Sequence, residues 1–132
     1  MKNIFWVYAI GIVVTMSICA PAYAVSYTYY NRSTAPARWK VAHPLCNKEE
    51  MVLLPGERKV YNKGSCDISW MEVWTEPTAK NSALSARSNK YISAAEGDAT
   101  FVLDDETDKL NIRQEITVKD GRQSYKRYEK LT

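Results

Sequence analysis

The sequence predicts a mainly β protein, a small antiparallel β-sandwich or barrel of about seven or eight strands, with one disulfide bond and room for one short helix. Three observations lead to this fold class. Most segments alternate apolar and polar residues with a period of two, which is typical of half-buried strands. Turn residues such as Pro55-Gly56 separate these segments at short intervals. An even pair of cysteines, Cys46 and Cys66, remains once an N-terminal export signal is set aside.

Residues 1–24 have the three parts of a secretory signal peptide. A short basic start containing Lys2 precedes an apolar run from Ile4 to Ile18, and Ala22 and Ala24 form a small-residue cleavage site. Cleavage is expected after Ala24. An uncleaved anchor is the alternative, because the apolar run just reaches the roughly 20 residues that a membrane helix needs. Cleavage is favoured because no basic cluster follows the run.

The mature chain, residues 25–132, is expected to be a single exported β domain. It carries no internal repeat, low-complexity segment or linker that would divide it. Removal of Lys2 with the signal lowers the net charge of +3 by one, which is too weak a bias for nucleic-acid binding. We therefore expect a secreted or periplasmic protein of bacterial type, with no nucleic-acid partner and no stable membrane insertion after cleavage.

Cys46 and Cys66 are expected to form a disulfide bond, because exported proteins meet an oxidising environment. Closing a loop of this length restricts the unfolded chain by roughly 3 kcal/mol. A metal site made by His43, Cys46, Cys66 and Asp67 is the alternative. Zinc sites usually carry two close-spaced ligand pairs, whereas Cys66 and Asp67 are adjacent, so the disulfide is favoured and no metal is expected.

The N-terminal half of the mature chain predicts four strands. The first covers residues 26–31, and the second carries Trp39, Val41 and His43 on one face. A turn containing Pro36 separates these two strands. Short apolar runs at residues 51–54 and 60–61 predict two more strands around the Pro55-Gly56 turn.

Residues 67–75 predict a central strand, because both of its faces carry bulky side chains. Ile68, Trp70, Glu72 and Trp74 share one face of this strand. The stretch between Pro77 and Ser88 is the least regular part of the chain, and it predicts either a short helix beginning near residue 81 or a loop. The loop is favoured, because small polar residues bury little surface.

The C-terminal third predicts a hairpin after an acidic connection. Strand-like segments at residues 99–103 and 110–119 flank this connection, and Asp120-Gly121 is a favourable two-residue hairpin turn. This turn would pair Ile116 with Tyr125 and Glu115 with Lys126.

Trp70, Glu72 and Trp74 are the most suggestive binding residues. They follow one another along a strand face in steps of about 6 to 7 Å, a spacing suited to stacking sugar rings or a peptide. The competing interpretation places Trp70 and Trp74 in the core of a domain that has few Phe and Leu residues. We favour the core for both tryptophans.

Charge is segregated along the C-terminal half. Between Glu96 and Asp108 acids occur without bases, which admits a calcium site but favours a solvated hairpin loop. Basic residues predominate from Lys109 to Lys130, a pattern that attracts acidic partners or anionic lipid head groups and more commonly serves solubility. Asn31-Arg32-Ser33 is an N-glycosylation triplet, which matters only in a eukaryotic secretory pathway.

Catalytic motifs are missing from the sequence. His43 is the only histidine and is expected to be structural, and the chain holds no nucleophile elbow, phosphate loop or zinc-peptidase helix. No cofactor is expected. Paired carboxylates, Glu72 with Asp67 or Glu76, keep a glycoside-type hydrolase open as an alternative.

Together these observations predict an exported non-enzymatic binding protein of the periplasm or extracellular space, with a protein or glycan partner. The alternatives are the secreted carboxylate-dependent hydrolase and a secreted enzyme inhibitor or virulence-associated factor. In the inhibitor, an exposed loop such as the one between Pro77 and Ser88 would enter the cleft of the target.

Overall fold

The computed structural model describes residues 25–79, 81–106 and 108–132, so the expected signal peptide lies outside the described residues. Nine strands and one 3-10 turn form in this part of the chain, which confirms the mainly β prediction. The strands are β1 (Val25–Asn31), β2 (Ala37–Ala42), β3 (Glu49–Leu53), β4 (Arg58–Gly64), β5 (Trp70–Thr75), β6 (Ser85–Ser88), β7 (Ala99–Glu106), β8 (Lys109–Asp120) and β9 (Gln123–Lys130).

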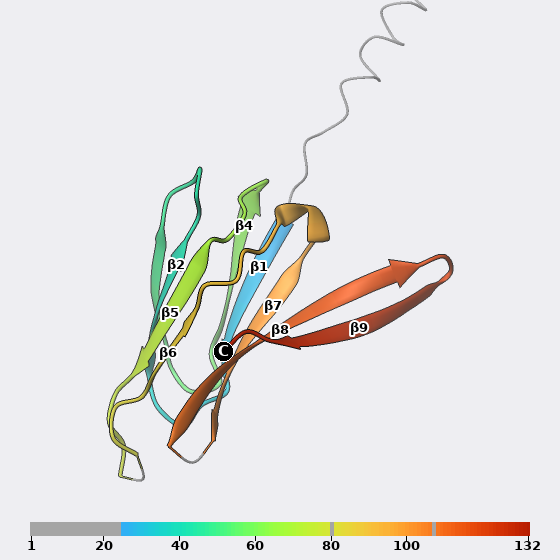
Figure 1. The fold of residues 1–132 in the computed structure, drawn as a ribbon. Coiled ribbons are helices and arrows are strands. Elements are labelled where there is room, and N and C mark those ends of the chain that lie inside the picture. The colour runs from blue at the N-terminus through green and yellow to red at the C-terminus, as the bar shows by residue number, and fades with distance from the viewer. Residues whose placement is uncertain (1–24, 80, 107) are drawn as a thin grey trace, which may run out of the picture.

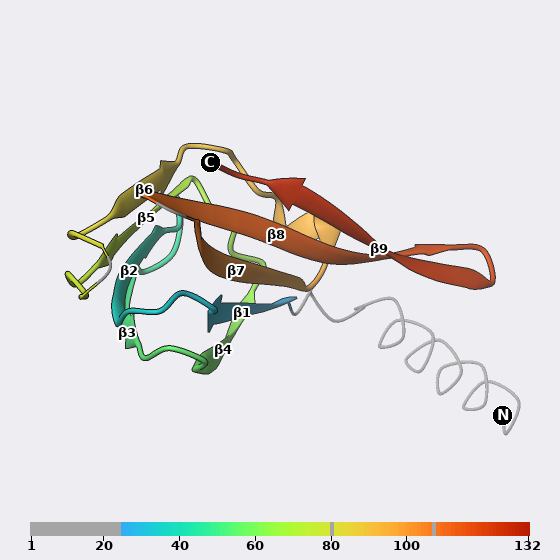
Figure 2. The same cartoon turned by 90° about the horizontal axis from the view of Figure 1, so that it is seen from below.

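Two sheets pack face to face in a sandwich-like arrangement (Figures 1 and 2). The five-stranded sheet has the order β4-β1-β7-β8-β9, and the four-stranded sheet has the order β3-β2-β5-β6. The named strand pairs are antiparallel, with the single exception of β1 and β7, which pair in parallel. A parallel pair needs a long crossover, and the chain between β1 and β7 supplies it by building the four-stranded sheet and β4.

Aromatic side chains fill the centre of the sandwich. Tyr27 and Tyr29 point inward from β1, and Phe101 points inward beside them from β7. The ring of Tyr29 meets Trp39 of the opposite sheet edge to face, with ring centroids 5.4 Å apart, and lies 5.5 Å from Phe101. All four side chains are completely buried. The alternation seen in residues 26–31 and 38–43 thus gives each sheet its inward face.

The expectation that Trp70 and Trp74 belong to the core is wrong. The inward positions of β5 are occupied by Met71 and Val73, and the two tryptophans point away from the opposite sheet. Ile68 is buried, but it belongs to an isolated bridge before β5 begins. The alternation shifts by one residue between this bridge and the strand, so Ile68 and Trp70 do not share a face. The central position of β5, between β2 and β6, is as predicted.

The segment between Pro77 and Ser88 forms neither the suggested helix nor a complete loop. Its last residues, Ser85–Ser88, form the edge strand β6, which pairs with β5. The one helical element of the described residues lies further on, a 3-10 turn over Ala94–Glu96 that Ser93 caps. Pairing with the central strand β5 supplies the hydrogen bonds that make this segment a strand, although its local sequence does not favour one.

The C-terminal hairpin has a different register from the one expected. Asp120 pairs with Gln123, so the two-residue loop consists of Gly121 and Arg122. Gly121 has a φ of 60°, which suits the first central position of such a turn. Ile116 consequently faces Arg127 and Glu115 faces Tyr128, in place of the predicted partners.

The predicted disulfide is confirmed. Cys46 and Cys66 are bonded with their Cα atoms 6.1 Å apart. Cys46 lies in the connection between β2 and β3, and Cys66 lies just after β4, so the bond joins the margins of the two sheets. The hydroxyl of Tyr27 donates a hydrogen bond to the carbonyl oxygen of Cys66 at 2.8 Å, which attaches the core to the same point.

Removing the disulfide should destabilise the domain strongly. The double variant C46S/C66S is expected to lose about 3 kcal/mol of unfolding free energy, because its unfolded chain is no longer restricted by the loop. Thermal unfolding should show a melting temperature lower by about 10 °C or more. A reductant should lower the melting temperature of the wild-type protein and leave that of the double variant unchanged. Equal melting temperatures for the two proteins would contradict this role.

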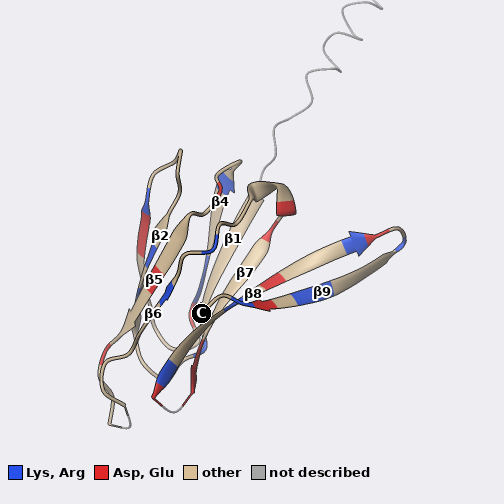
Figure 3. Cartoon of the chain, in the orientation of Figure 1, with Lys and Arg blue, Asp and Glu red and all other residues tan. Residues whose placement is uncertain are grey.

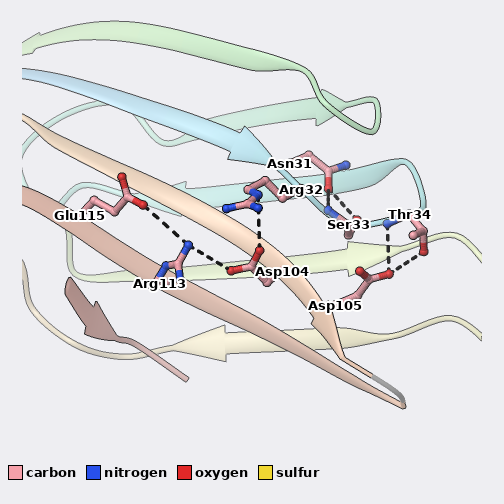
Figure 4. Close-up of polar contacts among 8 residues, drawn as sticks. All are labelled: Asn31, Arg32, Ser33, Thr34, Asp104, Asp105, Arg113 and Glu115. Atoms are coloured by element: carbon pink, nitrogen blue, oxygen red, sulfur yellow. Dashed lines mark hydrogen bonds and ion pairs between the residues drawn. The ribbon is translucent and has the colours of Figure 1, made fainter.

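Asn31 is a completely buried polar residue at the end of β1. Its side-chain nitrogen donates to the carbonyl oxygens of Ala35 and Leu53, each at 2.9 Å. Its side-chain oxygen accepts from the backbone nitrogen and the hydroxyl of Ser33, the turn contact drawn in Figure 4. The side chain therefore uses all of its hydrogen-bonding groups to hold the β1–β2 turn against β3. In the folded domain the side-chain nitrogen of Asn31 is therefore not accessible for N-glycosylation.

Replacing Asn31 by aspartate should be costly. N31D removes both amide donors from the buried carbonyl groups of Ala35 and Leu53 and places a carboxylate beside these two acceptors. We expect a loss of roughly 2 to 4 kcal/mol in urea unfolding at neutral pH. The matched control is N89D, because Asn89 is exposed and uses only its oxygen, which aspartate retains. Similar unfolding midpoints for N31D and N89D would contradict the assignment.

Candidate functional site

The structure brings Trp70, Glu72 and Trp74 together on the outer face of the four-stranded sheet. We call this surface the tryptophan face; it comprises Arg38, Lys40, Glu50, Val52, Trp70, Glu72, Trp74 and Arg87. Trp74 is 37% exposed, whereas Trp70 and Glu72 are partly buried. The three predicted residues therefore share one accessible surface, carried by the central strand β5.

A row of interface-type residues crosses the tryptophan face at Trp74. Arg38 of β2 lies between Val52 of β3 and Trp74 of β5, and Ser85 of β6 completes the row. Val52 is 51% exposed, so an apolar side chain stands beside the arginine and the indole. Tryptophan and arginine are enriched among the residues that dominate binding energy at protein interfaces.

A second row carries alternating charges. Glu50, Lys40, Glu72 and Arg87 follow one another across the four strands. The ammonium of Lys40 lies 3.5 Å from Glu50, and the guanidinium of Arg87 donates to Glu72 at 2.6 Å. Figure 3 shows the resulting mixture of both signs over β2, β5 and β6. Glu72 is thus neutralised by its neighbour, although a pair as exposed as this one adds little stability.

Cations lie over both indole rings. Arg87 and Lys48 lie 4.8 and 5.2 Å from the centroid of the Trp70 ring. Lys40 lies 5.3 Å from the centroid of the Trp74 ring. Such contacts stabilise an exposed aromatic ring and hold it in one orientation. Trp70 is covered by two cations, which leaves Trp74 as the more accessible ring.

Two hollows flank Trp74. One of about 310 Å³ lies toward β2 and β3 and includes Arg38, Val52 and Glu76 in its lining. The other, of about 150 Å³, lies toward β6 and includes Arg87. Trp74 lines both hollows, so its indole forms a ridge between two depressions that side chains of a partner can enter.

A third hollow lies on the other sheet, on a surface where no site was predicted from the sequence. It measures about 580 Å³ and is formed by residues of β1, β7, β8 and β9 with the turn before β7. Its lining is rich in serine and threonine, including Thr28, Thr100 and Thr117. These hydroxyls occupy the polar positions of alternating strands, and that recurrence is the only signal from which the hollow could have been suspected.

His43 belongs to a buried polar cluster and not to an accessible site. Its side chain is fully buried, with Nδ1 2.7 Å from the carbonyl oxygen of Asp67 and Nε2 3.5 Å from Glu49. Lys63 of β4 contacts the other oxygen of Glu49 at 3.0 Å, so the cluster links the edges of the two sheets. Burial, followed by the charge of Glu49, raises the pKa of the nearby Tyr29 well above its usual range.

Glu49 should make the stability of the domain sensitive to acid. Burial raises the pKa of its carboxyl, but the contacts with His43 and Lys63 outweigh burial and hold the pKa below its ordinary value of 4.5. A carboxyl whose pKa is lower in the folded state stabilises the fold above its unfolded pKa. This contribution is lost as the pH falls through the folded value.

We therefore expect E49Q to lose roughly 1 to 3 kcal/mol at neutral pH and the gap to wild type to close as the pH falls through the folded pKa of Glu49. Urea unfolding at several pH values measures the gap. The matched control is E50Q, since Glu50 is the next residue along β3 and is exposed. A gap that is independent of pH, or equal for E50Q, would argue against the cluster.

The acidic block is largely built into β7. Asp104 lies between Arg32 and Arg113, at 3.9 and 3.5 Å, and Asp105 accepts hydrogen bonds from Thr34 (Figure 4). The expectation of a solvated loop is therefore wrong for these two acids, because the β7–β8 pairing extends to Glu106. In the described part of the chain, no group of three or more histidine, cysteine or acidic side chains is placed to hold a metal ion.

The acidic residues predicted as a hydrolase pair are engaged in different contacts. Asp67 accepts hydrogen bonds from the backbone nitrogen of Ala94, at 2.6 Å, and from the hydroxyl of Tyr91, and these bonds lower its pKa. Glu72 forms an ion pair with Arg87 and does not belong to the hydrogen-bonded group of Asp67, Tyr91 and Ala94. Glu76 lies just beyond the end of β5, and it lines the hollow on one side of Trp74 whereas Glu72 lines the hollow on the other side.

Comparison with known proteins assigns no family to the chain. No family model matches it, and no curated protein matches its sequence. Within the described ranges, no helix has the length and apolar character needed to cross a membrane.

Proposed function

We propose that this chain is an exported, non-enzymatic binding protein that engages a protein partner through the tryptophan face. The observation that carries the proposal is Trp74, an exposed indole on a central strand with a hollow on each side. A rigid sheet presents this ring at little entropic cost, because the strand and its cations already hold it in place.

The chemistry of the face favours a protein over a glycan. Lys48 and Arg87 both lie over the Trp70 ring, so this indole offers little open face on which a sugar ring could stack. Glu72 is occupied by Arg87 and is a poor acceptor for sugar hydroxyls. A partner protein can instead insert side chains beside Trp74, against Val52 and Arg38, while the paired charges around them exclude water.

The proposed location is the periplasm or the extracellular space. Two features support it: the signal-like sequence of residues 1–24 and the bond between Cys46 and Cys66. Structural disulfides persist mainly in oxidising compartments. The partner is accordingly expected among exported or surface-exposed proteins.

The proposal can be tested in the cell with photo-crosslinking residues at two matched exposed valines. Val52 lies on the tryptophan face, and Val60 lies on β4 of the other sheet, 51% and 62% exposed. With the full chain exported from its own signal, we expect a crosslinked protein from position 52 and none of the same size from position 60.

The variant W74A should abolish that crosslink and weaken binding of the identified partner at least about 30-fold, as expected for a central tryptophan. Y125A is the control, because Tyr125 is an exposed aromatic of the other sheet. Equal crosslinking at both positions, or an undiminished crosslink in W74A, would refute the proposal.

A further inference from the structure

One hollow lies on the outer face of the five-stranded sheet, at the point where the C-terminal hairpin diverges from that sheet. β7 pairs with β8 only as far as Ala99 and Ile116, beyond which β8 and β9 continue as a two-stranded ribbon. Figures 1 and 2 show this ribbon extending away from the sandwich. The corner between the ribbon and the neighbouring β1 and β7 is a concave groove of about 580 Å³, which we call the hydroxyl groove.

Hydroxyl side chains line the groove. Thr28 and Thr100 are neighbours across the parallel β1–β7 pair, and Thr117 follows on β8. They lie on the outward face of their strands, so their hydroxyls are free of the core. A row of hydroxyls with one small apolar residue, Ala99, suits a ligand that is itself rich in hydrogen-bonding groups.

The charged groups of the groove balance. Its lining includes two carboxylates, Asp98 and Glu115, and two lysines, Lys119 and Lys126. The carboxylates are held in place, because Asp98 accepts from the backbone nitrogen of Ser26 at 2.7 Å and Glu115 lies 3.7 Å from Arg113. The ion pairs found within residues 25–132 as described include neither lysine. The groove thus offers fixed acceptors and movable donors without net charge.

An exposed aromatic ring adjoins the groove. Tyr128 is the cross-strand partner of Glu115, lies two residues from Lys126 on the same face of β9, and is 56% exposed. The guanidinium of Arg113 lies 5.6 Å from the centroid of this ring. Figure 4 shows the same guanidinium between Glu115 and Asp104. One arginine therefore orients both an acceptor of the groove and the ring beside it.

We propose that the hydroxyl groove binds a neutral saccharide. The ring of Tyr128 would stack against the apolar face of one sugar, and the hydroxyls of the sugar would exchange hydrogen bonds with Thr100, Thr117 and Glu115. Vicinal hydroxyls both donate and accept, which matches the mixed donors and acceptors of an uncharged groove. This site is separate from the tryptophan face, so saccharide binding would not compete with the proposed protein partner.

The competing ligand is an anionic polymer attracted by the basic residues of the hairpin. Such a ligand would approach Lys119 and Lys126 but would meet the carboxylates of Asp98 and Glu115 in the same groove. Its binding would weaken steeply as salt is added, whereas binding of a neutral saccharide depends on hydrogen bonds and stacking and changes little.

The test is titration calorimetry of the purified exported protein against short neutral oligosaccharides, namely gluco-, manno-, galacto- and N-acetylglucosamine oligomers, with polygalacturonate as the anionic probe. We expect one neutral class to bind with an affinity that is nearly independent of salt. Y128A and the double variant T100V/T117V should each weaken this binding at least about tenfold, the loss of roughly one good hydrogen bond or stacking contact.

Y125A is the matched control, because Tyr125 lies on the opposite face of β9 and is 53% exposed. It should bind as wild type does, and so should W74A, which separates this proposal from the preceding one. Thermal unfolding confirms that every variant is folded. Failure of all neutral oligomers to bind, salt-sensitive binding of polygalacturonate alone, or an equal loss in Y125A and Y128A would overturn the proposal.

Discussion

The edge-to-face contact between Tyr29 of β1 and Trp39 of β2 is the interaction on which the rest of the domain depends. It joins the two sheets at their centre, and Phe101 and Tyr27 extend the same aromatic layer along the five-stranded sheet. A small domain has little interior in which to bury apolar surface, so large rings supply much of what its core can gain. With β1 held between β4 and β7, the outward faces of both sheets remain available for other tasks.

Polar contacts and a disulfide bond join the two sheets at their margins, in addition to the aromatic layer that joins them at the centre. The disulfide of Cys46 and Cys66 joins the connections that follow β2 and β4, and Glu49 with Lys63 joins the edge strands β3 and β4. Asn31 holds the turn after β1 at the other end of the same strands. Because these links lie at the margins, the two outer faces are presented as rigid surfaces.

The two outer faces differ in chemistry although both belong to one sandwich. The tryptophan face combines Trp74 with paired charges, a composition typical of protein interfaces. The hydroxyl groove combines threonines, balanced charges and Tyr128, a composition suited to an uncharged, hydroxyl-rich ligand. The groove exists because the β8–β9 ribbon leaves the sheet, so its shape is a product of the hairpin.

Local sequence patterns were enough to predict the β class, the bonded cysteine pair, and the common face of Trp70, Glu72 and Trp74 on a central strand. Alternation with a period of two separates the faces of a strand, but it cannot say which face is inward when both carry bulk, so the tryptophans were misplaced. Moving the hairpin loop by one residue shifts each cross-strand partner by two positions and leaves the same residues on each face. The alternation pattern therefore could not specify the register of this hairpin. The parallel β1–β7 pair, the partners Arg87 and Lys40, and the hydroxyl groove were decided by tertiary structure alone. They depend on contacts between segments far apart in the chain, which local patterns do not specify.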